Sequence, residues 1–215
     1  MKIYDISQEV FTCSVFPGDA EPQKEVLLKI CDGAVCNLSA LHMCAHNGTH
    51  VDAPYHFSNE GETIDKMELD FFFGPGVVIR VTDKKAEEKI TMEDVMPYDE
   101  KIKEGTIVLF NTNWYKNRGT EAFYTHPYVA GEVAEYLVEK GVRFIAIDTM
   151  NADQSGGTEF PVHDLFSQKR LMIGENWAYF DHIDFEEGLH IAAFPMKIQG
   201  TDGSPVRAVA MQIEE

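Results

Sequence analysis

One short segment gathers most of the residues that could do chemistry. The stretch HNGTHVDAPYHF begins at His46 and places three of the chain's eight histidines, with one aspartate, in eleven positions. His46, His50 and Asp52 are separated by even numbers, so an extended segment would project them to one face. The glycine, the proline and the β-branched residues argue against a helix. Two imidazoles and a carboxylate that converge form the usual three-ligand set of a catalytic metal site.

Other uses of these residues fit the sequence less well. There is no GxSxG, and the cysteines lack the context of a thiol hydrolase. The spacing departs from HExxH because Asn47 stands where a zincin carries its general-base glutamate. A base for a bound water must therefore come from elsewhere, and His56 is the nearest candidate. The alternative is that the histidines are only hydrogen-bonded structural residues.

A second group of candidate ligands lies further along the chain. His163 and Glu175 are twelve residues apart in PVHDLFSQKRLMIGEN, and an intervening helix and strand could return the chain to the same cavity. Asp148 ends the strand predicted at VRFIAID, where α/β proteins often place polar site residues. It is either a partner that orients a ligand histidine or an N-cap or turn aspartate. Cys44 is close enough to His46 to be considered as a metal neighbour.

The segments around the histidine cluster are expected to be β-rich. IYDIS, EVLLKICD and NLSALHMCAH have strand composition or a period-two alternation, with turns at FPGDAEP and CDGAVC. In MELDFFFGPGVVIRVTD, residues 74–76 are expected to separate an aromatic core run from a Val/Ile strand.

From about residue 91 the pattern predicts alternating helices and strands. Thr91 and Asp94 predict a capped helix at MEDVM. HPYVAGEVAEYLVEKG predicts a helix with Pro127 near its first turn and Gly141 as its stop. TIVLFNT, VRFIAID, HIAAFPMKIQ and PVRAVAMQ are expected strands, PVHDLFSQKRLM a short helix, and GTDGSP a turn. The sequence therefore predicts a single α/β domain with mixed strands over residues 1–215.

Composition limits the partners. The formal charge of −18 opposes binding to nucleic acid or to anionic membranes, and no apolar run approaches the roughly 20 residues of a membrane-spanning helix. The N-terminal MKIYDISQEVF lacks an extended apolar segment, so we expect a cytoplasmic location. The four cysteines match no zinc finger or CxxC spacing and are expected to be reduced thiols.

The segment HNGTHVDAPYHF matches the HxGTHxDxPxHF signature at every fixed position. On this basis the chain resembles the cyclase family of metal-dependent hydrolases, which includes bacterial kynurenine formamidase. Supporting segments are YDIS, FPGD, TNWY, AIDTMNAD, PVHDLF, IGEN and FPMKIQGTDGSPVRAVA. The resemblance thus covers nearly the whole chain as one domain.

The resemblance implies a fold and an assembly. The fold is a swivelling β/β/α arrangement with mixed sheets around a β-barrel-like core. The assembly is a homo-oligomer, a dimer or a tetramer, in which the partner subunit completes part of the pocket for a small-molecule substrate.

The resemblance also implies a centre of two metal ions, usually zinc. Ligand sets of His, Asp and Glu also accept manganese. The implied ligands are His46, His50, Asp52, His163 and Glu175. The first three would bind one ion, and Asp52 would also reach the second ion, which His163 binds. Glu175 would contact both ions. His56 would be the catalytic proton shuttle.

The implied reaction is hydrolysis of a C–N amide bond in N-formylkynurenine or another arylformamide or N-acyl amine by a metal-activated hydroxide. Phe16 would line the substrate site, where formamidases of the family usually carry a tryptophan. Phenylalanine has a smaller ring and no N–H donor, so ring opening of a cyclic imide, an isatin-like amide or a lactone stays open. A non-catalytic metal-binding protein is a further alternative, although such a protein has no use for His56.

Overall fold

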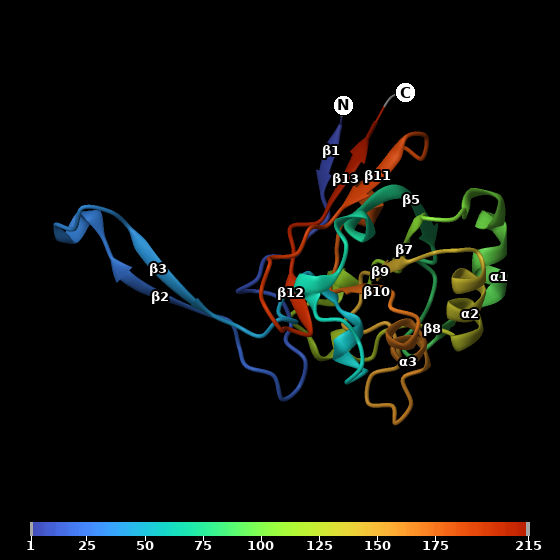
Figure 1. Cartoon of the computed structure of the whole chain (residues 1–215), viewed down its shortest axis with the longest axis horizontal. Helices are drawn as coiled ribbons and strands as arrows, with labels where there is room; N and C mark the ends of the chain where they lie inside the picture. Colours follow the sequence, from blue (N-terminus) through green and yellow to red (C-terminus); the bar gives the residue numbers. More distant parts are fainter. Residues whose placement is uncertain (1, 214–215) are drawn as a thin grey trace.

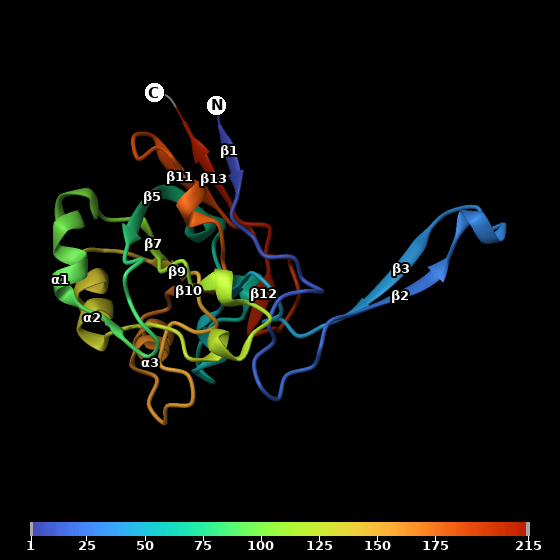
Figure 2. The ribbon, with the colours of Figure 1, turned by 180° about the vertical axis from the view of Figure 1, so that it is seen from behind.

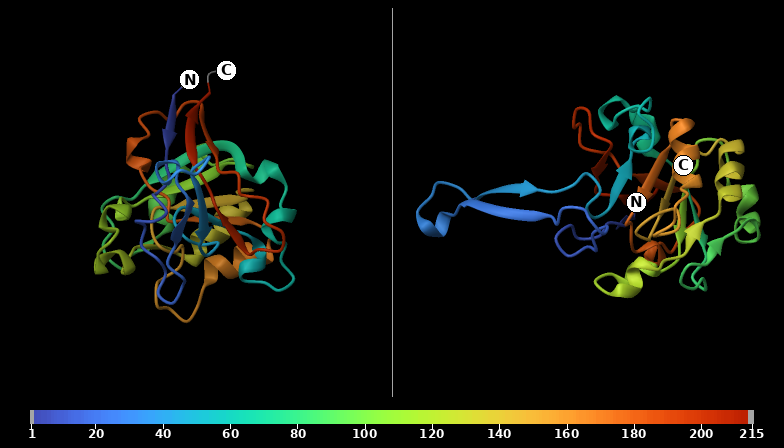
Figure 3. Two further views of the ribbon diagram at one scale, coloured as in Figure 1. Left: turned by 90° about the vertical axis from the view of Figure 1, so that its left-hand side faces the viewer. Right: turned by 90° about the horizontal axis from the view of Figure 1, so that it is seen from below.

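The chain is built on one large mixed sheet, seen in a computed structural model that describes residues 2–213 (Figure 1). Its nine strands curl into a half-barrel (Figure 3). In spatial order they are β1 (Ile3–Asp5), β13 (Val209–Gln212), β11 (Leu189–Ala192), β5 (Phe73–Arg80), β7 (Ile107–Asn111), β9 (Phe144–Ile147), β10 (Met172–Glu175), β4 (His50–Asp52) and β12 (Gly203–Pro205). The predicted single α/β fold with mixed strands is confirmed.

The centre of the sheet is parallel and its margins are antiparallel. Strands β5, β7, β9 and β10 run parallel, while β4, β11, β12 and β13 pair antiparallel with their neighbours. Every residue of β7 and β9 is buried, as expected for apolar strands that are covered on both faces. One face packs around Phe72, Trp177 and Phe180.

Three helices cover the other face of the sheet, as Figures 1 and 2 show. They are α1 (Met92–Val95), α2 (Gly131–Glu139) and α3 (Pro161–Gln168). The predicted caps of α1 are present, because Thr91 and Asp94 form a reciprocal capping box. The predicted stop of α2 is also present, since Gly141 follows the helix with φ +80°.

Two boundary predictions are wrong. Helix α2 begins at Gly131 rather than near Pro127, because residues Tyr128–Val129 form β8 and pair with β6 (Lys89–Ile90). Strand β5 continues through residues 74–76 instead of starting after them. Phe73, which was expected in the core, is 41% exposed. In both places the pairing of backbone groups with a neighbouring strand overrides the local turn signal.

Short 3-10 helices occupy many of the connections. They are η1 (Ile30–Asp32), η2 (Pro54–His56), η3 (Ile64–Lys66), η4 (Leu69–Phe72), η5 (Met96–Lys101), η6 (Trp114–Asn117), η7 (Glu121–Tyr124) and η8 (Phe180–His182). Within residues 2–213, no helix has the length and apolar character needed to cross a membrane.

The remaining strands stand apart from the sheet. The predicted strands β2 (Gln23–Leu28) and β3 (Leu38–His42) form an antiparallel hairpin that projects far from the body (Figures 1 and 2, and the right panel of Figure 3). We call residues 22–43 the arm. The two ends of the arm return to the body next to the histidine cluster.

Candidate metal centre

The register of three strands brings together residues that are far apart in the sequence. Strand β4 lies between β10 and β12, and His50 stands directly opposite Glu175. His50 and Asp52 are two residues apart on β4, so their side chains share the face on which Glu175 lies. All three residues are buried. Their ligand atoms lie within 4.8 Å of one another, which makes the group a candidate metal site.

His46 reaches this group from the turn that precedes β4. Its Nδ1 lies 2.8 Å from Oδ1 of Asp52. The turn passes through Gly48 with φ +67°, a conformation that glycine adopts at little cost. Gly203, which pairs with Asp52, leaves room for the imidazole, because a Cβ there would lie 2.9 Å from Cε1 of His46. Two glycines therefore allow His46 to approach the carboxylate.

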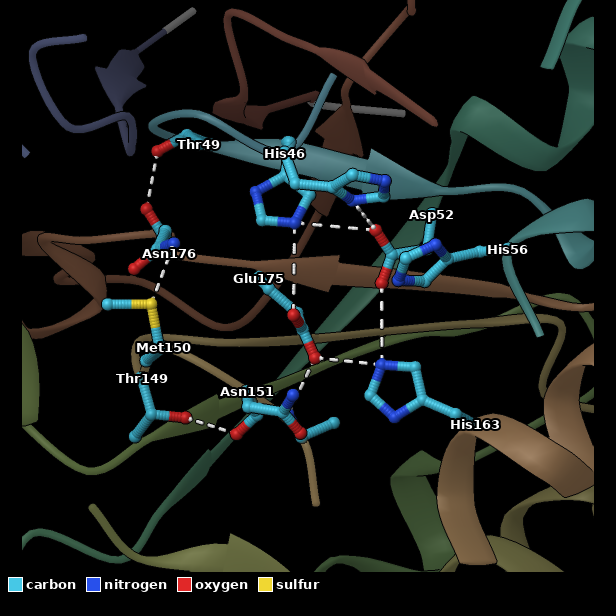
Figure 4. Close-up of polar contacts among 12 residues, drawn as sticks. His46, Thr49, Asp52, His56, Thr149, Met150, Asn151, His163, Glu175 and Asn176 are labelled. Atoms are coloured by element: carbon cyan, nitrogen blue, oxygen red, sulfur yellow. Dashed lines mark hydrogen bonds and ion pairs between the residues drawn. The ribbon is translucent and has the colours of Figure 1, made fainter. Parts of the chain in front are cut away.

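Helix α3 supplies His163 from the other side of the cluster (Figure 4). The Nε2 atom of His163 lies 3.5 Å from Oδ2 of Asp52 and 3.2 Å from Oε1 of Glu175. The five residues expected as ligands from the sequence thus meet in one cluster.

Asp52 is at the middle of this cluster, and its two oxygens face different histidines. Oδ1 lies 2.8 Å from His46 and 3.3 Å from Nε2 of His50, whereas Oδ2 lies on the side of His163. Oδ2 is buried and has no hydrogen-bond partner among residues 2–213. A buried carboxylate oxygen without a partner is costly unless a cation or a proton approaches it. The donor set therefore fits a divalent cation bound by nitrogen and oxygen ligands.

The charges in the cluster also favour a cation. Burial opposes protonation of His46, but the carboxylates of Asp52 and Asp202 outweigh it and raise the pKa of His46 to about 10. Burial likewise opposes protonation of His163, whose pKa is nevertheless raised well above its usual value by Glu175, Asp153 and Asp52. Positive charge next to the buried carboxylates is therefore favourable, and without a metal ion the protonated histidines supply it. Metal binding would displace these protons from the imidazoles.

Asp153 orients His163. Oδ2 of Asp153 lies 2.7 Å from Nδ1 of His163 and accepts the backbone N–H of the same residue, while Oδ1 accepts the N–H of Val162. Nδ1–H is thereby held on the carboxylate, and Nε2 is left to face Asp52 and Glu175. A carboxylate behind a ligand histidine fixes the tautomer and the ring orientation.

Asp148, the sequence-based candidate for that orienting role, has a different position. Its carboxylate accepts hydrogen bonds from the backbone N–H groups of Thr112 and Asn113 and from the Thr112 hydroxyl. Burial raises the pKa of Asp148 to about 7, although these donors oppose the shift. Asp148 holds the turn after β7, so the alternative of a turn aspartate is correct.

His56 lies at the mouth of the cluster, on η2. Its Nδ1 is 3.2 Å from Oδ2 of Asp202, and the same oxygen is 2.8 Å from Nε2 of His46. The His56 side chain is 30% exposed, compared with 3% for His50 and 2% for His163. His56 is therefore the cluster histidine with the best access to solvent.

Sequence reasoning missed Asp202 and the orienting role of Asp153. Asp202 lies in GTDGSP, which has the composition of a simple turn, and this turn contains β12 beside β4. Both aspartates occur in segments that carry the family resemblance, AIDTMNAD and FPMKIQGTDGSPVRAVA. Their presence in these segments was the only sign in the sequence that the two aspartates could belong to the site.

A pocket of about 550 Å³ opens over the cluster. Phe16 lines it and is 40% exposed, and Phe57 and Phe160 form an aromatic wall, with ring centroids 5.4 Å apart. Residues 2–213 contain a second candidate metal group, formed by His46, Asp52 and His56. Cys44 also lines the pocket but belongs to neither group. The pocket has the size and apolar lining of a small-molecule site.

The chain is similar to known proteins over most of its length. The family model "Putative cyclase" matches residues 4–154. The chain is 33% identical to a kynurenine formamidase of Geobacillus thermodenitrificans over 208 residues, which cover 95% of this chain and 94% of the relative.

Solved structures share the fold over almost the whole chain. One is isatin hydrolase A from Labrenzia aggregata bound to benzyl benzoate, with a TM-score of 0.89, 25% identity, and coverage of 99% of this chain and 94% of the other. Another, described as a "predicted metal-dependent hydrolase" from Bacillus stearothermophilus, has a TM-score of 0.78, 26% identity and 97% coverage of both chains. The chain therefore belongs to the cyclase family, as a metal-dependent amide hydrolase.

Proposed function

We propose that the protein hydrolyses an N-formyl or N-acyl aryl amine, with N-formylkynurenine as the first candidate substrate, at a centre of two zinc ions. The observation that carries the proposal is the position of Asp52, whose two oxygens face His46 and His50 on one side and His163 on the other. Similarity to kynurenine formamidases over 95% of the chain supports the substrate class.

The proposed ligands divide into two sets. His46, His50 and Asp52 would hold the first ion, and His163 would hold the second together with the other oxygen of Asp52. Glu175 lies 3.8 Å from Nε2 of His50 and 3.2 Å from Nε2 of His163, which supports contact with both ions. Imidazole and carboxylate ligands suit zinc but also accept manganese. Bound ions would lower the pKa of a water toward about 7 and polarise the substrate carbonyl.

His56 is the proposed proton carrier. Its Nδ1–H donates to Asp202, so Nε2 keeps a lone pair that can accept a proton from the attacking water. The protonated imidazole can then return the proton to the leaving nitrogen when the C–N bond breaks. A histidine suits both transfers because its ordinary pKa is about 6.5.

Phe16, together with Phe57 and Phe160, is proposed to hold the aryl ring of the substrate. The three phenylalanines line or border the same pocket as His46 and His56. Offset or edge-to-face contacts with a substrate ring would favour aromatic over aliphatic amides.

Ring opening of a cyclic imide, an isatin-like amide or a lactone is the second candidate. Isatin hydrolase A from Labrenzia aggregata matches 99% of the chain with a TM-score of 0.89. Phe16 in place of the tryptophan usual in formamidases also leaves room for a different ring. The same ligands and the same proton carrier would serve either reaction.

The deciding experiment combines metal content with turnover. Protein purified without a metal-affinity tag is analysed by mass spectrometry for metals and assayed on N-formylkynurenine, isatin, a cyclic imide and a lactone. We expect two zinc ions per chain and fastest turnover of N-formylkynurenine. Faster turnover of isatin, the imide or the lactone would select ring opening. Absence of bound metal, with no activity after metal addition, would contradict the proposal.

Replacement of Asp153 by asparagine tests the orientation of His163. An amide cannot give charged support to Nδ1–H of His163, so we expect the affinity for zinc to fall by about 10- to 100-fold. Competition with a fluorescent chelator measures this affinity. Asp148→Asn is the matched control, because Asp148 is equally buried but forms no hydrogen bond with a histidine in the described residues. Equal zinc affinity in both variants would contradict the role of Asp153.

We also propose a cytoplasmic homo-oligomer, a dimer or a tetramer. All four cysteines are free, and Cys31 and Cys36 are exposed. Exposed free thiols suit a reducing compartment. The projecting arm, in which every residue of β2 is exposed, also supports assembly.

A further inference from the structure

Asp19 is a residue of the pocket that the proposed reaction leaves without a role. It lines the same pocket as Phe16, which stands three positions earlier in the chain, and it is exposed. Within residues 2–213, the Asp19 carboxylate forms no hydrogen bond or ion pair with another side chain. A carboxylate that lines a pocket without a protein partner is available to a ligand.

The other carboxylates that line the pocket already have partners. Oε1 of Glu175 lies 3.2 Å from Nε2 of His163, and Oδ2 of Asp202 lies 2.8 Å from Nε2 of His46. Both carboxylates therefore belong to the histidine cluster. Among the described residues, Asp19 is the one lining carboxylate that forms no ion pair with a histidine.

The lining of the pocket contains no permanently charged cation to balance these acids. In the part of the chain that the structure describes, no lysine or arginine lines the pocket, and its basic side chains are His46, His50 and His56. The first two are proposed metal ligands, and His56 is the proposed proton carrier. The chain as a whole has a formal charge of −18. A substrate group beside Asp19 therefore meets negative charge, which favours a cation and disfavours an anion.

The segment that carries Asp19 is held against the body of the protein. Ser14 and Val15 are buried, and Oγ of Ser14 accepts the backbone N–H of Gly119 at 2.9 Å. A turn follows, in which the N–H of Asp19 donates to the carbonyl of Phe16 at 3.0 Å. An aromatic ring and a carboxylate thus line the pocket from one fixed turn.

We propose that Asp19 binds an ammonium group of the substrate, and that the protein prefers aryl formamides with a protonated alkyl amine over those with a carboxylate. This inference rests on the proposed function and names the charge of its substrate. The side chain of N-formylkynurenine carries both an ammonium and a carboxylate, and Asp19 matches the ammonium. An alkyl amine is protonated at pH 7, because its ordinary pKa is near the value of about 10.4 for lysine. A hydrogen bond between an ammonium and a carboxylate is roughly twice as strong as a neutral one.

The test compares three ortho-formamidophenyl ketones whose second ketone substituent is an aminoethyl, a propyl or a carboxyethyl chain. With the metal-loaded wild type, we expect kcat/KM to be about 5-fold higher for the aminoethyl than for the propyl ketone, and lowest for the carboxyethyl ketone. The contact lies outside the bond that breaks, so it stabilises the bound substrate and the transition state equally. The difference should therefore appear in KM rather than in kcat.

Substitutions of Asp19 assign the preference to this residue. Asp19→Asn should abolish the preference for the aminoethyl ketone and leave turnover of the propyl ketone unchanged. Asp19→Lys should reverse the order and favour the carboxyethyl ketone. The matched control is Glu21→Gln, which removes the same charge from an exposed residue two positions away that does not line the pocket. This control should keep the wild-type order.

The possible failures are distinguishable. Equal kcat/KM for the three ketones in the wild type, or a preference that Asp19→Asn leaves unchanged, would overturn the inference. Hydrolysis of the propyl ketone would then still support the proposed function. Equal effects of Asp19→Asn and Glu21→Gln would attribute the preference to the overall charge of the chain and would also overturn the role of Asp19. If none of the three ketones is hydrolysed, the proposed function fails, and the inference about its substrate fails with it.

Discussion

Replacement of Asp52 by asparagine is expected to remove both metal ions and lower kcat/KM by about 10³-fold or more. The buried carboxylate lies between His46 and His50 on one side and His163 on the other. The amide of asparagine has the same size but only one oxygen and no charge. It can therefore bind at most one of the two ions, and both ions lose the nearby negative charge of the carboxylate. Metal content and steady-state kinetics on the same preparation measure the two effects.

Asp148→Asn is again the control for Asp52→Asn, since it makes the same change at another fully buried carboxylate. It should keep the metal and most of the turnover. Circular dichroism of each variant checks that the fold is intact. If Asp52→Asn kept two ions per chain, Asp52 would not be a shared ligand, and a centre of two ions bridged by this residue would be wrong.

Replacement of His56 by alanine has the second largest expected effect, a fall in kcat of about 10²- to 10⁴-fold with unchanged metal content. His56 faces Asp202 through Nδ1 and is the most exposed histidine of the cluster, so it can exchange protons with solvent. The variant leaves an open space at the mouth of the pocket. Added imidazole should therefore restore part of the turnover, and a structural defect would not respond in this way.

His182→Ala is the matched control for His56. His182 is an exposed histidine on η8, stacked on Tyr179 and outside the pocket. It should retain wild-type turnover. Loss of an ion from His56→Ala would contradict the role of proton carrier and make His56 a ligand, as the proximity of its ring to His46 and Asp52 would allow.

Much of the fold followed from local pattern. The apolar strands β7 and β9, the capped start of α1 and the glycine stop of α2 were predictable, because burial on both faces and capping chemistry leave marks in adjacent residues. The start of α2 was not predictable, since residues 128–129 are drawn into a pairing with Lys89 and Ile90. That pairing depends on a segment nearly forty residues away.

For the site, the sequence by itself predicted the chemistry and the first proposed ligand set. The even spacing of His46, His50 and Asp52 and the proximity of His56 are local properties of one segment. The resemblance of that segment to the cyclase family extended the expectation to His163 and Glu175. Residue type and spacing were enough for this prediction, because few side chains bind metal ions and those that do must lie close together.

Only the tertiary structure decided which aspartates support the histidines. Asp153 reaches His163 at the start of helix α3. Asp202 reaches His46 because it lies beside the edge strand β12, which pairs with β4. Asp148 instead accepts a hydrogen bond from the backbone of the turn after β7. The exposure of the arm was equally hidden, since its strands alternate and pair like those of any sheet. The orientation of a carboxylate and the absence of a packing partner are set by contacts between distant segments, and local sequence does not record such contacts.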